Sequence, residues 1–168
     1  MDKLSANGGI LAYDMDHAIH IETPIGHLTI VGDNTAITRV CWGTEHPGDV
    51  QGTSVLRAAA TQLLEYFAGQ RTAFDIPLRP IGGDFFQRVW AIMRRDVPYG
   101  TTISYSALAT LAGNPRAARA VGMANHRNPI PIFIPCHRVL GKYGDLTGFR
   151  SGVAKKAWLL KLEQGTNP

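Results

Sequence analysis

Near the middle of the chain, two prolines and two glycines fall within ten residues, DIPLRPIGGD at 75–84. Proline removes a backbone donor and glycine favours irregular backbone, so this stretch is expected to interrupt regular structure. Segments rich in Ile, Val and Thr precede it and predict strands, whereas the segments that follow have mostly helical periodicity. With 168 residues, the chain is long enough for two small domains. We therefore predict an N-terminal α/β domain over 1–76, a linker over 77–84 and a mainly α-helical C-terminal domain over 85–168.

The N-terminal part predicts a small antiparallel sheet followed by one helix. Three strands are expected at 18–23, 27–31 and 35–42, joined by turns at 24–26 and 32–34. Residues 1–16 show no clear periodicity, and 43–53 predict a loop. Ser54 is expected to cap the helix and Gly69 to end it. The face expected to be buried consists of Leu56, Ala59, Ala60, Leu63, Leu64 and Phe67.

Four helices are expected in the C-terminal part. Asp84 and Gln87 resemble a capping box that opens the first of them. Its buried side chains are expected to be Phe86, Val89, Trp90 and Met93. The last helix is expected from about Ser151 to Glu163.

The two helices between these have the proportions of a DNA-binding helix-turn-helix, although such pairs also occur in bundles. Ser104 is expected to cap the first and Gly113 to end it. Asn114 is expected to cap the second, with Pro115 at its first position. This second helix is expected to run to about residue 126.

The second helix combines small residues with arginines in the sequence PRAARAVGMANHRN. Gly122 costs about 1 kcal/mol relative to alanine inside a helix. Small side chains favour close approach either to another helix or to a nucleic-acid groove. Arg116, Arg119 and Arg127 favour the groove.

Charge is divided unevenly along the chain. Residues 1–84 carry a net charge of −5 and residues 85–168 a net charge of +9. A strongly basic half indicates a polyanionic partner, most simply nucleic acid, and the alternative is a chance imbalance of surface charge.

Several classes of protein are excluded by composition. No apolar stretch approaches the roughly 18 residues of a membrane span, and the N-terminus lacks the apolar core of a signal peptide. Two cysteines are too few for a disulfide scaffold, so a reducing, cytoplasmic setting is expected. Cys41 and His46 are the only nearby soft pair, whereas zinc needs four ligands. No phosphate-cradling glycine loop is present, so neither a metal nor a dissociable cofactor is expected.

The segment PIPIFIPCHRV at 129–139 carries the strongest chemical signal. Its prolines bracket an apolar stretch that is expected to be buried. Most buried cysteines are inert, but positive charge beside Cys136 would increase its thiolate fraction. Adjacent residues of an extended chain point to opposite sides, so His137 reaches the sulfur only if the chain turns or through a water.

Glu163 ends the last predicted helix, where a carboxylate meets the negative end of the helix dipole. It is either an ordinary surface acid or the group that orients His137. In the second case Cys136, His137 and Glu163 form a relay for nucleophilic catalysis.

These features together resemble the O6-alkylguanine-DNA alkyltransferases, the methylated-DNA–protein-cysteine methyltransferases. The family signature PCHRV stands at 135–139. The resemblance extends from about 85 to 165 through FQRVW, PYGTTISYSALA, GNPRAARAVGMANHRNPIPIFIPCHRV and KKAWLLKLE, and more loosely through TPIGHLTI and LLEYFAG. It implies a ribonuclease-H-like N-terminal domain and a helical DNA-binding and catalytic domain with a helix-turn-helix.

The resemblance also implies the roles of individual residues. Cys136 is the alkyl acceptor, and His137, through a water, and Glu163 keep it as a thiolate. Asn128 braces the turn before the active-site segment, and Tyr105 binds the flipped guanine and donates a proton to it. The implied DNA-binding residues are Ser104, Arg116, Arg119, Ala120, Gly122 and Arg127. The implied base pocket consists of Tyr105, Asn125, Cys136, Val139, Phe149 and Arg150.

The function implied is direct reversal of DNA damage by a monomer acting on duplex DNA that contains alkylated guanine. An alkyl group on guanine O6 is accessible only after base flipping, in which Arg119 enters the duplex. The resemblance implies that O4-alkylthymine is also accepted, and that the helix from Pro115 lies in the minor groove. Transfer to Cys136 leaves a thioether, so each molecule acts once.

One segment departs from the family pattern Gly-Tyr-x-Gly-Gly, because 148–152 reads Gly-Phe-Arg-Ser-Gly. Phe149 lacks the hydroxyl, and Arg150 and Ser151 replace smaller residues beside the pocket.

Two other functions fit parts of the sequence. A Cys-His-Glu thiol hydrolase would turn over repeatedly, and a non-catalytic helix-turn-helix DNA-binding protein would not need Cys136.

Overall fold

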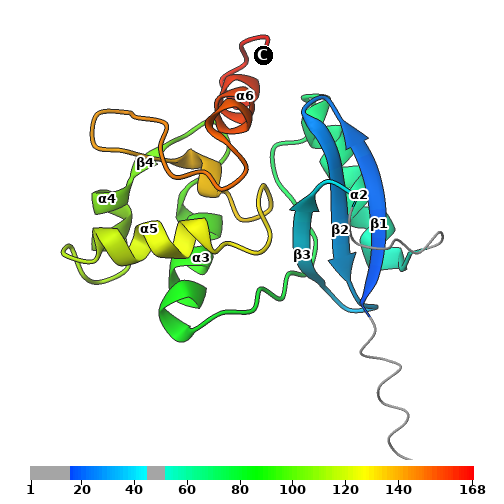
Figure 1. The fold of residues 1–168 in the computed structure, drawn as a ribbon, viewed down its shortest axis with the longest axis horizontal. Helices are drawn as coiled ribbons and strands as arrows, with labels where there is room; N and C mark the ends of the chain where they lie inside the picture. The colour runs from blue at the N-terminus through cyan, green and yellow to red at the C-terminus, as the bar shows by residue number, and fades with distance from the viewer. Residues whose placement is uncertain (1–15, 45–51) are drawn as a thin grey trace, which may run out of the picture.

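The computed structural model describes residues 16–44 and 52–168. Most of the N-terminal segment without periodicity and part of the expected loop at 43–53 lie outside the described residues. The N-terminal sheet and helix lie beside a mainly helical C-terminal half (Figure 1). Within the described residues, no helix is long and apolar enough to cross a membrane.

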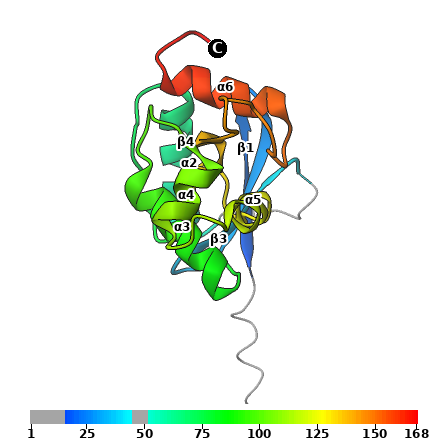
Figure 2. The same cartoon turned by 90° about the vertical axis from the view of Figure 1, so that its left-hand side faces the viewer.

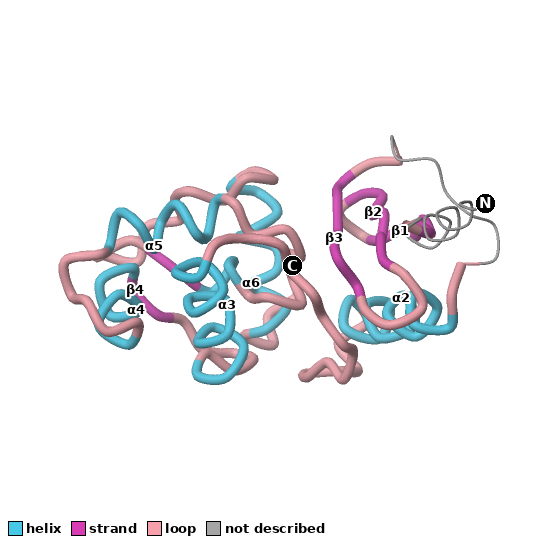
Figure 3. Tube along the Cα trace, turned by 90° about the horizontal axis from the view of Figure 1, so that it is seen from below, coloured by secondary structure: helices cyan, strands magenta, loops and turns pink. Residues whose placement is uncertain are grey.

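The N-terminal half is a three-stranded antiparallel sheet covered on one face by a helix, which confirms the predicted meander (Figure 3). Its elements are β1 (His17–Thr23), β2 (Gly26–Gly32), β3 (Ile37–Trp42) and α2 (Ser54–Phe67). Leu28 and Ile30 of the central strand are fully buried and share the core with Leu56 and Leu63 of α2. The strand β3 forms the edge of the sheet nearest the C-terminal half (Figures 1 and 3).

Two details of α2 differ from the prediction. Thr53, not Ser54, caps the helix, because its Oγ1 accepts from Leu56 N at 3.2 Å. The same hydroxyl donates to the carbonyl of Asp33 at 3.0 Å, which ties the helix start to the sheet. Leu64 is 46% exposed, whereas Tyr66 is fully buried. The buried face of α2 therefore includes Tyr66 instead of Leu64, because the C-terminal half covers the helix at Tyr66.

The expected linker at 77–84 is not a free connection. Ile37 N donates to the carbonyl of Pro77 at 2.9 Å, and Arg79 N donates to the carbonyl of Ile37 at 2.8 Å. Residues 77–79 therefore run parallel to the start of β3. Gly82 allows the ring of Trp90 to pack on the backbone, since a Cβ there would lie 2.5 Å from the ring.

The C-terminal half packs its helices around the segment that contains Cys136 (Figure 2). Its elements are α3 (Asp84–Asp96), β4 (Ile103–Ser104), α4 (Tyr105–Leu111), α5 (Ala118–His126), the 3-10 turn η1 (Cys136–Arg138), β5 (Val139–Leu140) and α6 (Val153–Glu163). The short parallel pair β4–β5, which periodicity did not predict, places the start of α4 beside the end of η1.

Local capping decides the helix boundaries here. Ser104 caps α4 as predicted, with its Oγ accepting from Ala107 N at 3.1 Å. The predicted capping box of Asp84 and Gln87 is wrong. Gly83 is the N-cap of α3, and the Gln87 side chain donates to the carbonyl of Pro80.

The starts of α5 and α6 also differ from the prediction. The helix α5 begins at Ala118 rather than Pro115, since Asn114 starts a turn in which Ala117 N donates to its carbonyl at 2.9 Å. The helix α6 begins at Val153 rather than Ser151.

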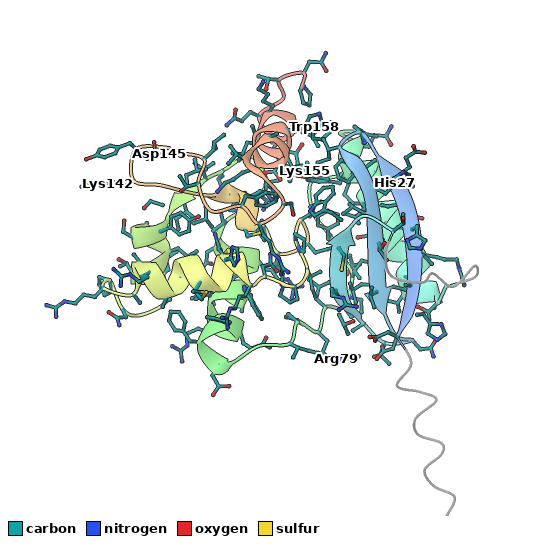
Figure 4. The ribbon with its side chains drawn as sticks, in the orientation of Figure 1. His27, Arg79, Lys142, Asp145, Lys155 and Trp158 are labelled. Carbon is teal, nitrogen blue, oxygen red and sulfur yellow. The ribbon has the colours of Figure 1, made fainter. Side chains whose placement is uncertain are left out.

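Aromatic rings and a backbone hydrogen bond are among the contacts between the two halves. The ring centroids of Phe67 and Trp158 lie 5.8 Å apart, and Figure 4 shows Trp158 extending from α6 toward the N-terminal half. Val40 N, in β3, donates to the carbonyl of Pro129 at 2.9 Å. The N-terminal sheet is thereby attached directly to the segment that leads to Cys136.

Candidate active site

The segment before Cys136 turns sharply and is buried from Ile130 to Val139. Ile132 has φ = 76°, a left-handed conformation that is unfavourable for a β-branched residue. Ile134 N donates to the carbonyl of Ile130 at 3.0 Å across this turn. Strain of this kind persists only where the surrounding packing imposes it, and it is common at functional sites. The turn delivers Cys136 to the start of η1.

Cys136 is 6% exposed, and Asn128 holds its sulfur. The Asn128 amide nitrogen lies 3.0 Å from the Cys136 Sγ and also donates to the carbonyl of Ile134 at 2.9 Å. Its amide oxygen accepts from Ile130 N at 3.0 Å. Because both ends of the amide are bonded, the orientation of Asn128 is fixed, which is compatible with the bracing role that the resemblance implied.

Burial raises the pKa of the Cys136 thiol, although the Asn128 hydrogen bond and the charge of Lys156 both lower it. Burial thus favours the thiol over the thiolate that the resemblance implied. Lys156 is itself buried, and its Nζ donates to the carbonyls of Val139 at 2.6 Å and Thr147 at 2.9 Å. The sequence offered one signal for this lysine, since it precedes Leu159, Leu160 and Glu163 at helical spacing on one face.

Glu163 is the centre of a buried hydrogen-bond network rather than a surface acid. His137 Nε2 lies 2.7 Å from its Oε1, and Arg138 donates to both carboxylate oxygens at 2.8 and 2.9 Å. Tyr66 of α2 donates to Oε1 at 2.7 Å. Burial alone would raise the pKa of Glu163, but the bonds from His137 and Arg138 outweigh it and lower the pKa to about 2.

His137 is fully buried, and this burial lowers its pKa despite the Glu163 carboxylate. The neutral ring therefore carries its proton on Nε2, which faces Glu163. Nδ1 is buried and has no hydrogen-bond partner among the described residues. Glu163 and His137 form the pair expected from the sequence, and Nδ1 has a lone pair available to accept a proton.

A cavity of about 500 Å³ opens beside Cys136 between the two halves of the molecule. Its predicted lining residues Asn125, Cys136, Phe149 and Arg150 are all present. The N-terminal half contributes Arg39, Val40, Cys41 and Trp42, and the rest of the lining is His126, Arg127, Asn128, Pro129, Pro131 and Ser151. The contribution of β3 could not be predicted from local pattern, since it depends on how the sheet packs.

Two residues expected in the base pocket do not line this cavity. The Tyr105 hydroxyl donates to the carbonyl of Thr147 at 3.1 Å, and burial raises its pKa. Val139 is fully buried, pairs with Ile103 in β4–β5, and its carbonyl is bonded to Lys156.

The expected DNA-binding residues lie on and around α5. Arg116, Arg119, Ala120 and Arg127 are exposed. A Cβ at Gly122 would meet only the Tyr105 ring, at 3.9 Å, so packing within the protein does not require glycine there. Ser104 is half-buried and serves as the α4 cap. In the described part of the chain, no cluster of three or more His, Cys, Asp or Glu side chains is placed to hold a metal ion.

The fold and the site together define a protein with one buried, oriented cysteine beside an exposed, arginine-bearing helix. Family models match both halves: the 6-O-methylguanine DNA methyltransferase ribonuclease-like domain over 18–80, and the DNA binding domain of the same family over 84–165. This chain belongs to the 6-O-methylguanine DNA methyltransferase family.

Individual relatives agree over most of the chain. The methylated-DNA–protein-cysteine methyltransferases of Methanosarcina barkeri and Mycobacterium tuberculosis are each 44% identical, over 86% and 92% of this chain and 94% and 96% of the relatives. The crystal structure of the M. tuberculosis O6-methylguanine methyltransferase covers 92% of this chain and 96% of its own at 43% identity, with a TM-score of 0.80. The OGT of the same organism in complex with DNA also has a TM-score of 0.80, at 43% identity over 90% of this chain and 95% of its own.

Proposed function

We propose that this chain repairs duplex DNA by moving the alkyl group from guanine O6 to the sulfur of Cys136, once per molecule. The observation that carries the proposal is the position of Cys136. Its sulfur is held by Asn128 in the wall of a cavity that both halves enclose. The similarity to methylated-DNA–protein-cysteine methyltransferases over most of the chain supports the same reaction.

The thiol must lose its proton before it attacks, because the thiolate is the nucleophile. His137 Nδ1 accepts this proton through a water, and Glu163, which binds the opposite ring nitrogen, stabilises the resulting charge. The Cys136 sulfur then forms a bond to the alkyl carbon as the bond from that carbon to guanine O6 breaks. Guanine leaves with the electron pair and takes up one proton from Tyr105, whose hydroxyl first releases the Thr147 carbonyl. Protonated His137 then gives its proton to solvent, and Tyr105 regains one from solvent.

The product is a thioether, which has no leaving group that water can displace, so the protein is not regenerated. A thiol hydrolase would instead turn over repeatedly. A non-catalytic DNA-binding protein would have no use for the relay of Cys136, His137 and Glu163.

Attack of the Cys136 sulfur on the alkyl carbon of O4-alkylthymine is chemically equivalent to its attack on O6-alkylguanine. A reaction that needs a free thiol suits the reducing cytoplasm.

DNA binding is assigned to the helix-turn-helix formed by α4 and α5. The small residues Ala120, which is exposed, and Gly122, which is half-buried, let α5 lie close to the minor groove, and Arg119 fills the space left by the flipped base. One monomer supplies every group that this scheme uses.

The test is incubation with duplex DNA that carries a labelled methyl group on guanine O6, followed by intact-protein mass and peptide mapping. The expected result is one methyl per protein on the Cys136 peptide, with Cys41 as the internal control. Label on Cys41, or more than one equivalent repaired per protein, would refute the assignment.

A further inference from the structure

Three arginines line the cavity beside Cys136, and they come from both halves of the molecule. Arg39 lies on β3, Arg127 follows α5, and Arg150 precedes α6. His126 also lines the cavity, whereas no aspartate or glutamate is among the described lining residues. We call these three lining arginines, Arg39, Arg127 and Arg150, the cationic wall of the pocket.

Within the described part of the chain, the cationic wall has no charge partner. None of its three guanidinium groups makes a hydrogen bond or ion pair with any described residue. By contrast, Arg71 pairs with Glu65, Arg79 with Asp33 and Arg95 with Asp96 on other surfaces. Like charges that converge on one cavity repel each other, and a bound anion would remove this repulsion.

A second feature of the same cavity also favours an acceptor ligand. Trp42 lines the pocket, and its indole Nε1 is a buried donor without a partner among the residues described. Lys155 places its Nζ 5.0 Å from the centroid of the Trp42 ring, and Figure 4 shows it extending from α6 toward the sheet. The cavity next to Cys136 is thus lined by positively charged and donor side chains, and no acidic side chain is among its described lining residues.

We propose that the cationic wall is an oxyanion site that binds a phosphate or carboxylate of the substrate next to the alkyl group. This inference rests on the proposed function. The planar guanidinium fork matches both phosphate and carboxylate geometry. The anion has two possible sources: a backbone phosphate beside the flipped nucleotide, or a carboxylate on the alkyl group itself. In either case Arg39 makes the N-terminal half part of the substrate site, and Arg150 makes the departure at 148–152 a determinant of specificity.

The experiment compares wild type with Arg39→Gln, Arg150→Gln and the double variant. Arg88→Gln is the matched control, because it removes one exposed positive charge from α3 without changing the cavity lining. Four duplexes are used. The first contains O6-methylguanine, and the second is identical but has uncharged methylphosphonates flanking the lesion. The third and fourth carry O6-carboxymethylguanine and its neutral isostere O6-carbamoylmethylguanine. Single-turnover rate constants for Cys136 labelling are measured, and thermal melts verify that each variant folds.

If the ligand is a phosphate, the rate constant for Cys136 labelling is expected to fall about tenfold in Arg39→Gln, Arg150→Gln and the double variant. The loss should be the same for the methyl group and for both larger groups. A phosphate ligand also predicts that the methylphosphonate duplex slows wild type but causes no further loss in the double variant. A carboxylate ligand instead predicts that wild type prefers carboxymethyl over carbamoylmethyl by about tenfold. It also predicts that the double variant loses this preference, and that its rate constant falls less on the methyl substrate than on the carboxymethyl substrate.

Either of these patterns supports the oxyanion site and identifies its source. Variants that match Arg88→Gln on all four duplexes, while wild type labels Cys136 normally, would overturn the oxyanion site alone. A wild-type protein that leaves Cys136 unlabelled on every duplex would overturn the proposed function, and this inference with it.

Discussion

Tyr66 and Glu163 are 97 positions apart in the chain, yet the Tyr66 hydroxyl donates to the Glu163 carboxylate at 2.7 Å. Tyr66 belongs to the N-terminal helix α2, whereas Glu163 ends α6 and binds His137. The N-terminal half therefore does more than cover the C-terminal half. It supplies one of the donors that keep a buried carboxylate ionised at the centre of the site.

Replacing Tyr66 by phenylalanine is expected to destabilise the protein by about 1–3 kcal/mol, because a hydrogen bond to a buried charged group is lost while the ring remains packed. The measurement is urea unfolding monitored by fluorescence. Tyr143→Phe serves as the control, since Tyr143 is 84% exposed. Equal midpoints for the two variants would show that the Tyr66 hydroxyl contributes nothing.

Protonation of Glu163 is expected to weaken the folded state in acid. Its folded pKa, about 2, lies below the ordinary value of 4.5, so the stabilisation is complete above about pH 4.5 and is lost as pH falls toward 2. The difference amounts to about 3 kcal/mol. Unfolding free energies measured at pH 6 and pH 3 should therefore differ less for Glu163→Gln than for wild type. A variant with the full wild-type pH dependence would assign the effect to other carboxylates, of which Asp33 also has a lowered pKa.

The same Glu163→Gln substitution is expected to raise the pKa at which Cys136 becomes reactive. Without the carboxylate, protonated His137 loses its stabilising partner, and the thiolate loses a cation that favours it. Thiolate absorbance against pH, and the rate of alkyl transfer against pH, should both shift to higher pH. Unchanged curves would mean that Glu163 serves only the fold.

Arg119→Ala is expected to slow repair of duplex DNA by about tenfold or more while leaving reaction with free O6-methylguanine unchanged. Arg119 is exposed, and extruding a base costs a few kcal/mol that a side chain inserted in the duplex offsets. Single-turnover rates on the two substrates give the comparison. Equal losses on both would exclude a role in flipping.

Methylation of Cys136 is expected to lower the melting temperature by several degrees. Cys136 is 6% exposed and its sulfur accepts a hydrogen bond from Asn128, so an added methyl group both crowds a packed site and displaces this contact. Overpacking typically costs about 1–3 kcal/mol, and a chain of this size loses roughly 2–4 °C per kcal/mol. Melts before and after reaction, with DNA removed, provide the test. A melting temperature that stays equal or rises would contradict the packing argument.

The sequence by itself determined the features that depend on neighbouring residues. Alternation of apolar residues predicted the three strands, Ser104 predicted the start of α4, and the run from Pro135 to Val139 indicated a nucleophilic Cys136. Capping was the least predictable local feature. Thr53 and Gly83 cap their helices because distant contacts, such as that between Thr53 and Asp33, select among adjacent candidates.

Only the tertiary structure decided which groups surround Cys136. Arg138 is a charged residue that local pattern would place at the surface, yet it is buried and Glu163 of α6 accepts its hydrogen bonds. The backbone carbonyl that accepts from buried Lys156, that of Val139, also comes from a distant segment. Tyr66 and the β3 residues that line the cavity come from the N-terminal half, whose sequence indicates only a sheet and a helix. Hydrophobic periodicity reports which face of an element is buried, but not which element covers it. The partners of Glu163 and the lining of the cavity were therefore fixed by the docking of the two halves.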